Sequence, residues 1–284
     1  MQLKLKIYFH ELQLIFYFYY IRLDTKKLIL REWISNDVTR DPEKIIEIMI
    51  QNAGPHFQKL VQALVKEEGL PNRLKILFKK IESSVKPIPS VYAAGIIRPE
   101  MAQYNLTFLK DKPLGTGSMA QVHVGKYNDF YDVVIRFLKP EIEKRAQEDY
   151  SILLQLANEV DNDPVFTKLG VPKISYLVDD IHYSVTEELD LNKTYQNQMK
   201  ARKIYHGKSF EFDDLKIKIS VPLIMTYKNG SKILVQEKVS GGSLDTVYEK
   251  YKSEIPFLKR NVVEAIAKTW IEEVLYGSGF YHAD

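Results

Sequence analysis

The sequence predicts an α+β protein in which helices precede a small antiparallel sheet, and a further helical segment follows it. Apolar residues recur at helical spacing ahead of the sheet, and short β-branched segments surround a glycine-rich turn at 114–123. A long apolar helix pattern occupies 258–275. We therefore expect a helical N-terminal extension over 1–100, a sheet domain over 101–236, and the start of a helical lobe over 237–284.

The composition is typical of a globular protein and excludes several functions. The 284 residues leave room for one large domain or two lobes, with 45% hydrophobic and 27% charged residues. A net charge of +3 without a basic cluster gives no basis for nucleic-acid binding. The absence of cysteine excludes a disulfide framework and suits a reducing, cytoplasmic compartment. The six histidines show no ligand spacing, so we expect no metal site from them.

The aromatic segment at 14–21 is the one stretch that suggests a membrane. A spanning helix needs about twenty apolar residues, so we expect no transmembrane helix. Tyrosines do suit a bilayer interface, where the ring is buried and the hydroxyl stays hydrated. We favour a buried strand or helix here, and peripheral contact with a membrane surface or lipid stays an alternative.

The N-terminal extension is predicted to consist of helices separated by breaks. Asp-Pro-Glu at 41–43 is a helix start, with a capping side chain, a proline in the first turn and an acid near the positive end. After the Gly-Pro break at 54–55, apolar residues over 57–65 follow i, i+3, i+4 spacing. Another helix is expected over 74–81, and the two prolines of 86–90 make a linker.

The glycine-rich turn Leu-Gly-Thr-Gly-Ser-Met-Ala-Gln-Val-His at 114–123 is the most informative segment. The strand Val-Val-Ile-Arg at 133–136 follows, and Lys-Pro at 139–140 ends it because proline lacks the N–H of a ladder. Protein-kinase-type folds hold ATP with this layout, in which turn N–H groups lie over the phosphates and a strand cation reaches them. A plain hairpin turn is the alternative.

Five residues of the turn are candidate nucleotide contacts. Gly115 and Gly117 match the first two glycines of a phosphate-binding loop, since only a residue without Cβ lets the backbone approach that closely. Ser118 lies between them and Ala120, which takes the place of the third glycine. Val122 is expected to cover the adenine.

The remaining elements follow from periodicity and breaks. An amphipathic helix is predicted over 142–160, and residues 184–190 are predicted to lead into a polar helix that runs through Lys200. Strands are expected at 221–226 and 232–239. The apolar stripe of the final helix is wide enough for burial on most sides.

The order of these motifs resembles the UbiB/ADCK-type atypical kinases associated with ubiquinone metabolism, over about residues 50–284. The resemblance rests on a helix similar to K-x-G-Q at 54–62, Gln-Val-His at 121–123, Glu-Leu-Asp at 188–190, a hinge at 234–237 and His-Ala-Asp at 282–284. Each match is weak, but their common order is specific.

The resemblance implies a protein-kinase-like N-lobe that binds ATP. Glu188 is then the counterpart of the kinase ion-pair glutamate and is expected to pair with Arg136, which stands where the family has lysine. Arginine stays charged and can pair bidentately with a carboxylate or phosphate, but its planar fork is larger than an ammonium group. Asp190 closes the Glu-x-Asp motif, and the backbone from Glu237 to Val239 is expected to meet the adenine.

Two further motifs of the family have counterparts in this sequence, and each differs from the family pattern. Lys59 and Gln62 match K-x-G-Q and, being three apart, are expected on one helix face turned towards the nucleotide, although Val61 replaces the glycine. Asp284 matches the catalytic aspartate. In the family an asparagine and a second aspartate follow it and hold Mg²⁺. The sequence ends before them, so we expect weak nucleotide binding and no metal-dependent phosphoryl transfer.

Three interpretations of function remain open. The chain is an atypical kinase-like protein that acts as a lipid-pathway kinase or ATPase, or a catalytically inactive, truncated pseudokinase, or a helical interaction or membrane-surface module that uses 1–100. The motif order favours kinase-like ancestry. Arg136 and the missing metal ligands favour inactivity.

Overall fold

The computed structural model describes residues 54–66, 72–83, 85, 87–164, 173–212 and 215–281. It confirms an α+β fold, with two compact units. The helical unit contains the chain up to Pro87 with Thr116–Ala120 and Leu138–Leu189, and the sheet unit contains Ile88–Gly115, Gln121–Phe137 and the chain from Asp190 onward. The predicted helix start at 41–43 and the aromatic segment at 14–21 lie outside the described residues.

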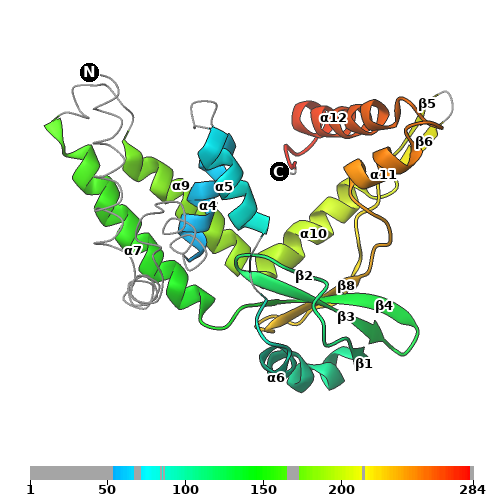
Figure 1. The fold of residues 1–284 in the computed structure, drawn as a ribbon. Helices are drawn as coiled ribbons and strands as arrows, with labels where there is room; N and C mark the ends of the chain where they lie inside the picture. The colour runs from blue at the N-terminus through cyan, green and yellow to red at the C-terminus, as the bar shows by residue number, and fades with distance from the viewer. Residues whose placement is uncertain are drawn as a thin grey trace. The chain divides into compact units, whose positions relative to one another are not determined.

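Four helices of the helical unit pack on one another (Figure 1). They are α4 (Pro55–Lys66), α5 (Asn72–Ser83), α7 (Ile142–Asp161) and α9 (Ile174–Leu189). The periodicity at 57–65, 74–81 and 142–160 predicted α4, α5 and α7 correctly. Their apolar faces form the core, in which Phe57 of α4 packs with buried side chains of α7 and α9. Burial of these faces supplies most of the stability of short helices.

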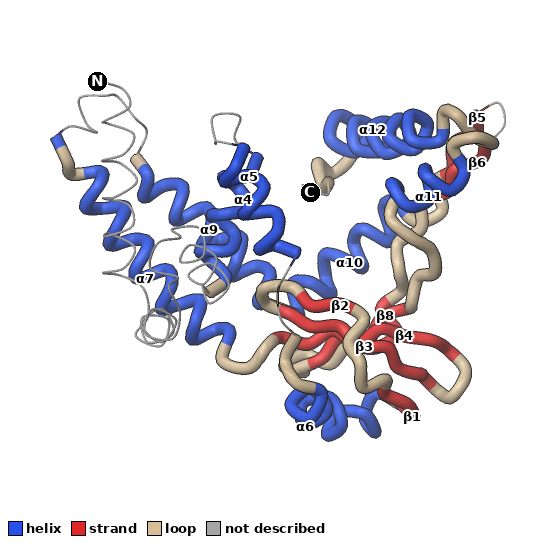
Figure 2. Tube along the Cα trace, viewed as in Figure 1, coloured by secondary structure: helices blue, strands red, loops and turns tan. Residues whose placement is uncertain are grey.

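The sheet unit is built on an antiparallel sheet (Figure 2). Its strands are β1 (Leu106–Leu109), β2 (Gly115–Thr116), β3 (Ala120–Tyr127), β4 (Tyr131–Leu138), β7 (Ile224–Thr226) and β8 (Ile233–Glu237). The strand order is β1-β3-β4-β8-β7, with β2 paired to β3. Asn128 and Asp129 join β3 to β4 with φ of 50° and 62°. Positive φ at both central residues is what a type I′ hairpin turn requires.

Helix α6 (Ser90–Met101) covers one face of this sheet. Ala93 and Ile97, one turn apart, are fully buried in a core with Val133, Ile135 and Phe137 of β4. Side chains of a strand alternate between its two faces. The even-numbered residues of β4 therefore lie on the face opposite to α6.

The rest of the sheet unit follows Asp190. It consists of α10 (Leu191–Tyr205), a hairpin of β5 (Ser209–Phe212) and β6 (Leu215–Lys218), α11 (Leu244–Tyr251) and α12 (Leu258–Tyr276), and the short 3-10 turn η2 (Ala102–Tyr104) follows α6. The predicted polar helix through Lys200 is confirmed as α10, and the residues predicted to lead into it, 184–189, form the last turns of α9, which ends before Asp190. The Asp190 carboxylate accepts hydrogen bonds from the N–H groups of Asn192 and Lys193, which caps α10.

Helix α12 differs from its prediction in burial. Its inner side includes the buried Ala265 and Thr269. The expectation of burial on most sides is wrong, because one broad face exposes large apolar side chains, namely Val263, Ile266, Ile271, Val274 and Leu275. Within the described ranges, no helix has both the length and the apolar character needed to cross a membrane.

We predict that Gly125→Ala destabilises the sheet. A Cβ at Gly125 in β3 would lie 2.7 Å from Ile135 Cδ1 and 2.8 Å from the Phe108 carbonyl oxygen. Overpacking of this kind costs about 1–3 kcal/mol, measured as a lower free energy of unfolding in urea. The control is Gly95→Ala on α6, where no described atom lies within 4 Å of the added Cβ. Equal urea midpoints for wild type and Gly125→Ala would contradict this packing.

Candidate functional site

The glycine-rich turn connects β2 to β3, as the strand–turn–strand pattern predicted. The Leu114 N–H donates to the Val122 carbonyl at 2.8 Å, and the Gly117 N–H donates to the Ala120 carbonyl at 2.8 Å. No described atom lies within 4 Å of a Cβ built at Gly115, and at Gly117 the nearest is the Ala120 oxygen at 3.7 Å. The turn backbone is therefore open on the side where a phosphate group would approach.

Met119 anchors the turn in the helical unit. Its side chain is 3% exposed and packs in a core with Ile142, Ala146, Ile181 and Val185. The Lys139 N–H also donates to the Met119 carbonyl at 2.9 Å. Sequence reasoning did not single out Met119, although one large apolar side chain inside a turn of small and polar residues was a usable signal.

Strands β3 and β4 place the candidate ligand residues on one face of the sheet. Along β3, Gln121 and His123 are buried and alternate with the half-buried Val122. The His123 ring lies 5.9 Å from that of Phe137, on the α6 side. Val122 and Arg136 consequently share the opposite face, which is the geometry expected of an adenine cover and a phosphate-binding cation.

The helical unit brings together the two family motifs that it contains. Lys59 of α4 forms an ion pair between its Nζ and Oε1 of Glu188, in the last turn of α9. The two side chains are 27% and 39% exposed, so solvent screens part of the attraction. Gln62 follows one turn later on α4 and is partly buried. The predicted pairing of Arg136 with Glu188 would join the two units, and it stays a prediction.

Two stacked histidines hold α4 against α9. His56 Nε2 and His182 Nδ1 are 2.9 Å apart, and the ring of Tyr150 stacks on His182 with centroids 3.7 Å apart. The Tyr150 hydroxyl donates to Asp179 at 2.9 Å, and this bond is the main reason that the pKa of Tyr150 is raised. Burial, with His182 close by, lowers the pKa of His56 to about 4, so His56 is neutral at physiological pH.

Asp149 of α7 fixes the beginning of α4. Its carboxylate is buried, and a Cβ at Gly54 would lie 2.2 Å from Asp149 Oδ2. Only glycine allows this approach. A carboxylate in this position also suits the positive end of the α4 dipole. The break that the sequence showed at 54–55 therefore has a packing role.

The other predicted site residues have separate places. The Glu237 N–H donates to the Leu223 carbonyl at 2.8 Å, and the Glu237 carboxylate accepts from the Leu223 N–H at 3.1 Å. Val239 is 63% exposed, and the predicted adenine contact of the backbone over 237–239 stays a prediction. Asp190 caps α10. Asp284 lies outside the described residues.

The described residues offer polar donor groups on one side of the sheet. The open turn offers backbone N–H groups, and Arg136 offers a cation on the same side of the sheet as Val122. Across the described ranges, no group of three or more histidine, aspartate or glutamate side chains is arranged to hold an ion.

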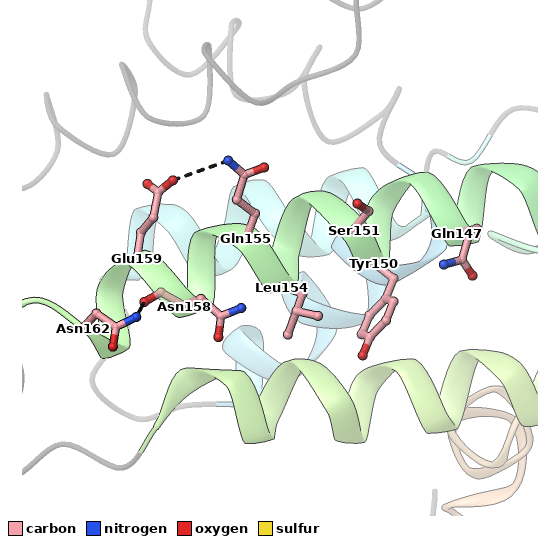
Figure 3. Close-up of a pocket in the computed structure, with 8 residues that line it drawn as sticks. All are labelled: Gln147, Tyr150, Ser151, Leu154, Gln155, Asn158, Glu159 and Asn162. Carbon is pink, nitrogen blue, oxygen red and sulfur yellow. Dashed lines mark hydrogen bonds between the residues drawn. The ribbon is translucent and has the colours of Figure 1, made fainter.

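A shallow groove runs along α7 in the helical unit (Figure 3). The described residues that line it belong to α7 and its C-cap, and they are Gln147, Tyr150, Ser151, Leu154, Gln155, Asn158, Glu159 and Asn162. Several bond to the same helix, as Asn162 Nδ2 does when it donates to the Asn158 carbonyl at 2.8 Å. None of the predicted site residues lines it, so the candidate site is the turn and the strand face described above.

The antiparallel sheet, the glycine-rich turn and the strand cation together define a kinase-like α+β protein. The family model described as "ABC1 atypical kinase-like domain" matches residues 80–284. The chain therefore belongs to this family, as the resemblance to UbiB/ADCK-type proteins predicted.

Curated relatives and one solved structure are similar to the chain. A "Probable protein kinase UbiB" of Marinobacter nauticus is 26% identical over 84% of this chain and 42% of its own length. Another protein of that name, from Aliivibrio fischeri, is 24% identical over 89% of this chain and 45% of its own length. The chain thus spans less than half of these relatives. The Rv3197–erythromycin complex from Mycobacterium tuberculosis aligns with a TM-score of 0.40 and 18% identity, over 79% of this chain and 54% of that one.

We predict that acid weakens the helical unit through His56. The pKa of His56 is about 4 in the folded chain and about 6.5 when unfolded. The unfolded state therefore binds more protons, and the free energy of unfolding falls as the pH drops from about 6.5 towards 4. Between pH 7 and pH 5, the protonation of His56 in the unfolded state lowers the free energy of unfolding by about 2 kcal/mol.

Urea unfolding at both pH values tests this prediction. His56→Phe keeps a ring of similar size but removes the titrating group, so its loss of stability between pH 7 and pH 5 should be smaller than that of the wild type. An identical loss in both proteins would show that His56 does not titrate with this low pKa.

Proposed function

We propose that this chain binds a nucleoside triphosphate on the sheet face that carries Val122 and Arg136. The turn N–H groups face the phosphates, Arg136 contacts them, and Val122 and the backbone near Val239 hold the adenine. The observation that carries the proposal is that Val122 and Arg136 share the face opposite to α6, beside an open glycine-rich turn. Membership of an atypical kinase-like family supports the same ligand.

Arg136 suits phosphate binding for an electrostatic reason. A guanidinium group stays charged at any physiological pH and can donate two parallel hydrogen bonds to one phosphate. Arg136 lies on β4 opposite Leu234 of β8, in the centre of the sheet. The backbone of a central strand is hydrogen-bonded to a neighbouring strand on each side. A cationic side chain on such a strand therefore starts from a rigid backbone, which favours a fixed position for the phosphate.

We further propose a role in ubiquinone or lipid metabolism, as a kinase or ATPase. The support is the family and the name "Probable protein kinase UbiB" of the relatives. ATP with Mg²⁺ would supply the phosphoryl group. A lipid-linked role also implies peripheral contact with a membrane surface.

A nucleotide-binding protein without phosphoryl transfer is the second candidate. Two features favour it, namely Arg136 in place of the strand lysine and the ion pair that Lys59 forms with Glu188. In active kinases the corresponding glutamate pairs with the strand lysine. Mg²⁺-dependent ATP turnover by the purified chain separates the two candidates, because the second predicts binding without turnover.

Gly115→Ala tests nucleotide binding directly. The added methyl group meets no described atom, so the free energy of unfolding should stay unchanged. It would, however, occupy the space where a phosphate meets the backbone, and ATP affinity should fall about tenfold in isothermal titration calorimetry. Gly95→Ala on the exposed side of α6 is the matched control and should bind ATP like the wild type. The proposal fails when the wild type binds no ATP, or when Gly115→Ala binds it equally well.

A further inference from the structure

Two polar side chains of β3, Gln121 and His123, are buried in the face of the sheet that packs on α6. Their neighbours in this core are apolar residues such as Ile135 and Phe137. A buried amide or imidazole destabilises the fold unless its polar atoms are hydrogen-bonded. Gln121 and His123 are neighbours on one face of β3, and two buried polar side chains in an apolar core require a structural explanation.

Their hydrogen bonds form a continuous relay. Gln121 Oε1 accepts from the Ile88 N–H at 2.9 Å, and Gln121 Nε2 donates to the Ile88 carbonyl at 3.4 Å. Gln121 Nε2 also lies 2.9 Å from His123 Nε2, and His123 Nδ1 lies 2.9 Å from the Lys110 carbonyl oxygen. The relay thus joins β3 to the linker ahead of α6 and to the residue that follows β1.

The direction of each bond in the relay is fixed by chemistry. An amide nitrogen can only donate, so His123 Nε2 must accept from Gln121. A carbonyl can only accept, so His123 Nδ1 must carry the proton and donate to Lys110. All of these bonds are therefore satisfied when His123 donates through Nδ1 and accepts at Nε2.

The hydrogen bonds of the relay fix the register of β3. Side chains of a strand alternate between faces, so a shift by one residue would turn Gln121 out of the core and bring Val122 into it. Gln121 lies near the end of the glycine-rich turn, directly after Ala120, and the Lys110 N–H donates to the Val124 carbonyl at 2.8 Å. Lys110 lies just before the chain that enters the turn, so the relay holds the segments on both sides of the turn.

We propose that Gln121 and His123 are positioning residues that hold the glycine-rich turn over the nucleotide phosphates. They contact no ligand themselves, since they lie on the face opposite to Val122. This inference rests on the proposed nucleotide site. It adds that, besides the anchor at Met119, the turn is held from the core side of β3 by the hydrogen bonds to Ile88 and Lys110.

The test compares two ligands in one pair of variants. Gln121→Met keeps the length of the side chain and removes the hydrogen bonds that Gln121 makes with Ile88 and His123. Gln103→Met makes the same change at an exposed position. Calorimetric titrations measure ATP, which needs the turn, and adenosine, which has no phosphate. For Gln121→Met we expect ATP affinity to fall about tenfold, with adenosine affinity unchanged. Gln103→Met should match the wild type for both ligands.

Hydrogen exchange gives a second readout that needs no ligand. In Gln121→Met the amides of Leu114 and Gly117 should exchange at least about tenfold faster than in the wild type, because the turn is less firmly held. The amides of Ile233 and Val235 in β8 should keep their protection, which shows that the sheet itself remains folded.

Three results would overturn the proposal that Gln121 and His123 position the turn. An equal loss of affinity for ATP and adenosine overturns the proposal, because it indicates general damage to the sheet. Unchanged ATP affinity, or unchanged exchange at Leu114 and Gly117, overturns it as well. A wild type that binds no ATP overturns the proposed function itself, and the exchange data then report separately whether the relay holds the turn.

Discussion

The alternation of side chains along β3 is the constraint on which the rest of the candidate site depends. Gln121 and His123 enter the core under α6, and this fixes Val122 on the opposite face, where Arg136 of the neighbouring strand also lies. Because the period of a strand is two, no local adjustment can move one of these residues without its neighbours. The buried polar relay and the half-buried face of Val122 and Arg136 are therefore two consequences of one register.

In the helical unit, buried contacts hold α4 in place, and the ion pair of Lys59 with Glu188 adds little to its stability. The ion pair of Lys59 with Glu188 is partly exposed, and such pairs contribute about 0–1 kcal/mol. Burial of Phe57 alone contributes about 1.5–3 kcal/mol, and the stacked His56 and His182 add further contact. Helix α4 thus docks through its apolar and aromatic side chains, and the docked position decides that Lys59 is the cation beside Glu188.

Sequence reasoning predicted the features that local pattern determines. The periodicity of α4 and α7 and the strand–turn–strand order at 114–123 needed no tertiary information. It missed α6, because Gly95 and Pro99 disfavour a helix while the burial of Ala93 and Ile97 stabilises it. The ion pair of Lys59 and the relay of Gln121 depend on segments distant in sequence, so their partners were not readable from spacing.

The central claim is that ATP binds the sheet face that carries Val122. Titration of ATP into methyl-labelled protein, followed by NMR, tests this claim most directly. Val122 on β3 and Val133 on β4 lie on opposite faces of the same sheet, and Val133 is fully buried under α6. The account predicts that ATP shifts the methyl signals of Val122 and leaves those of Val133 and Ile135 in place. Shifts confined to Val133 and Ile135, or to groups outside the sheet, would contradict it.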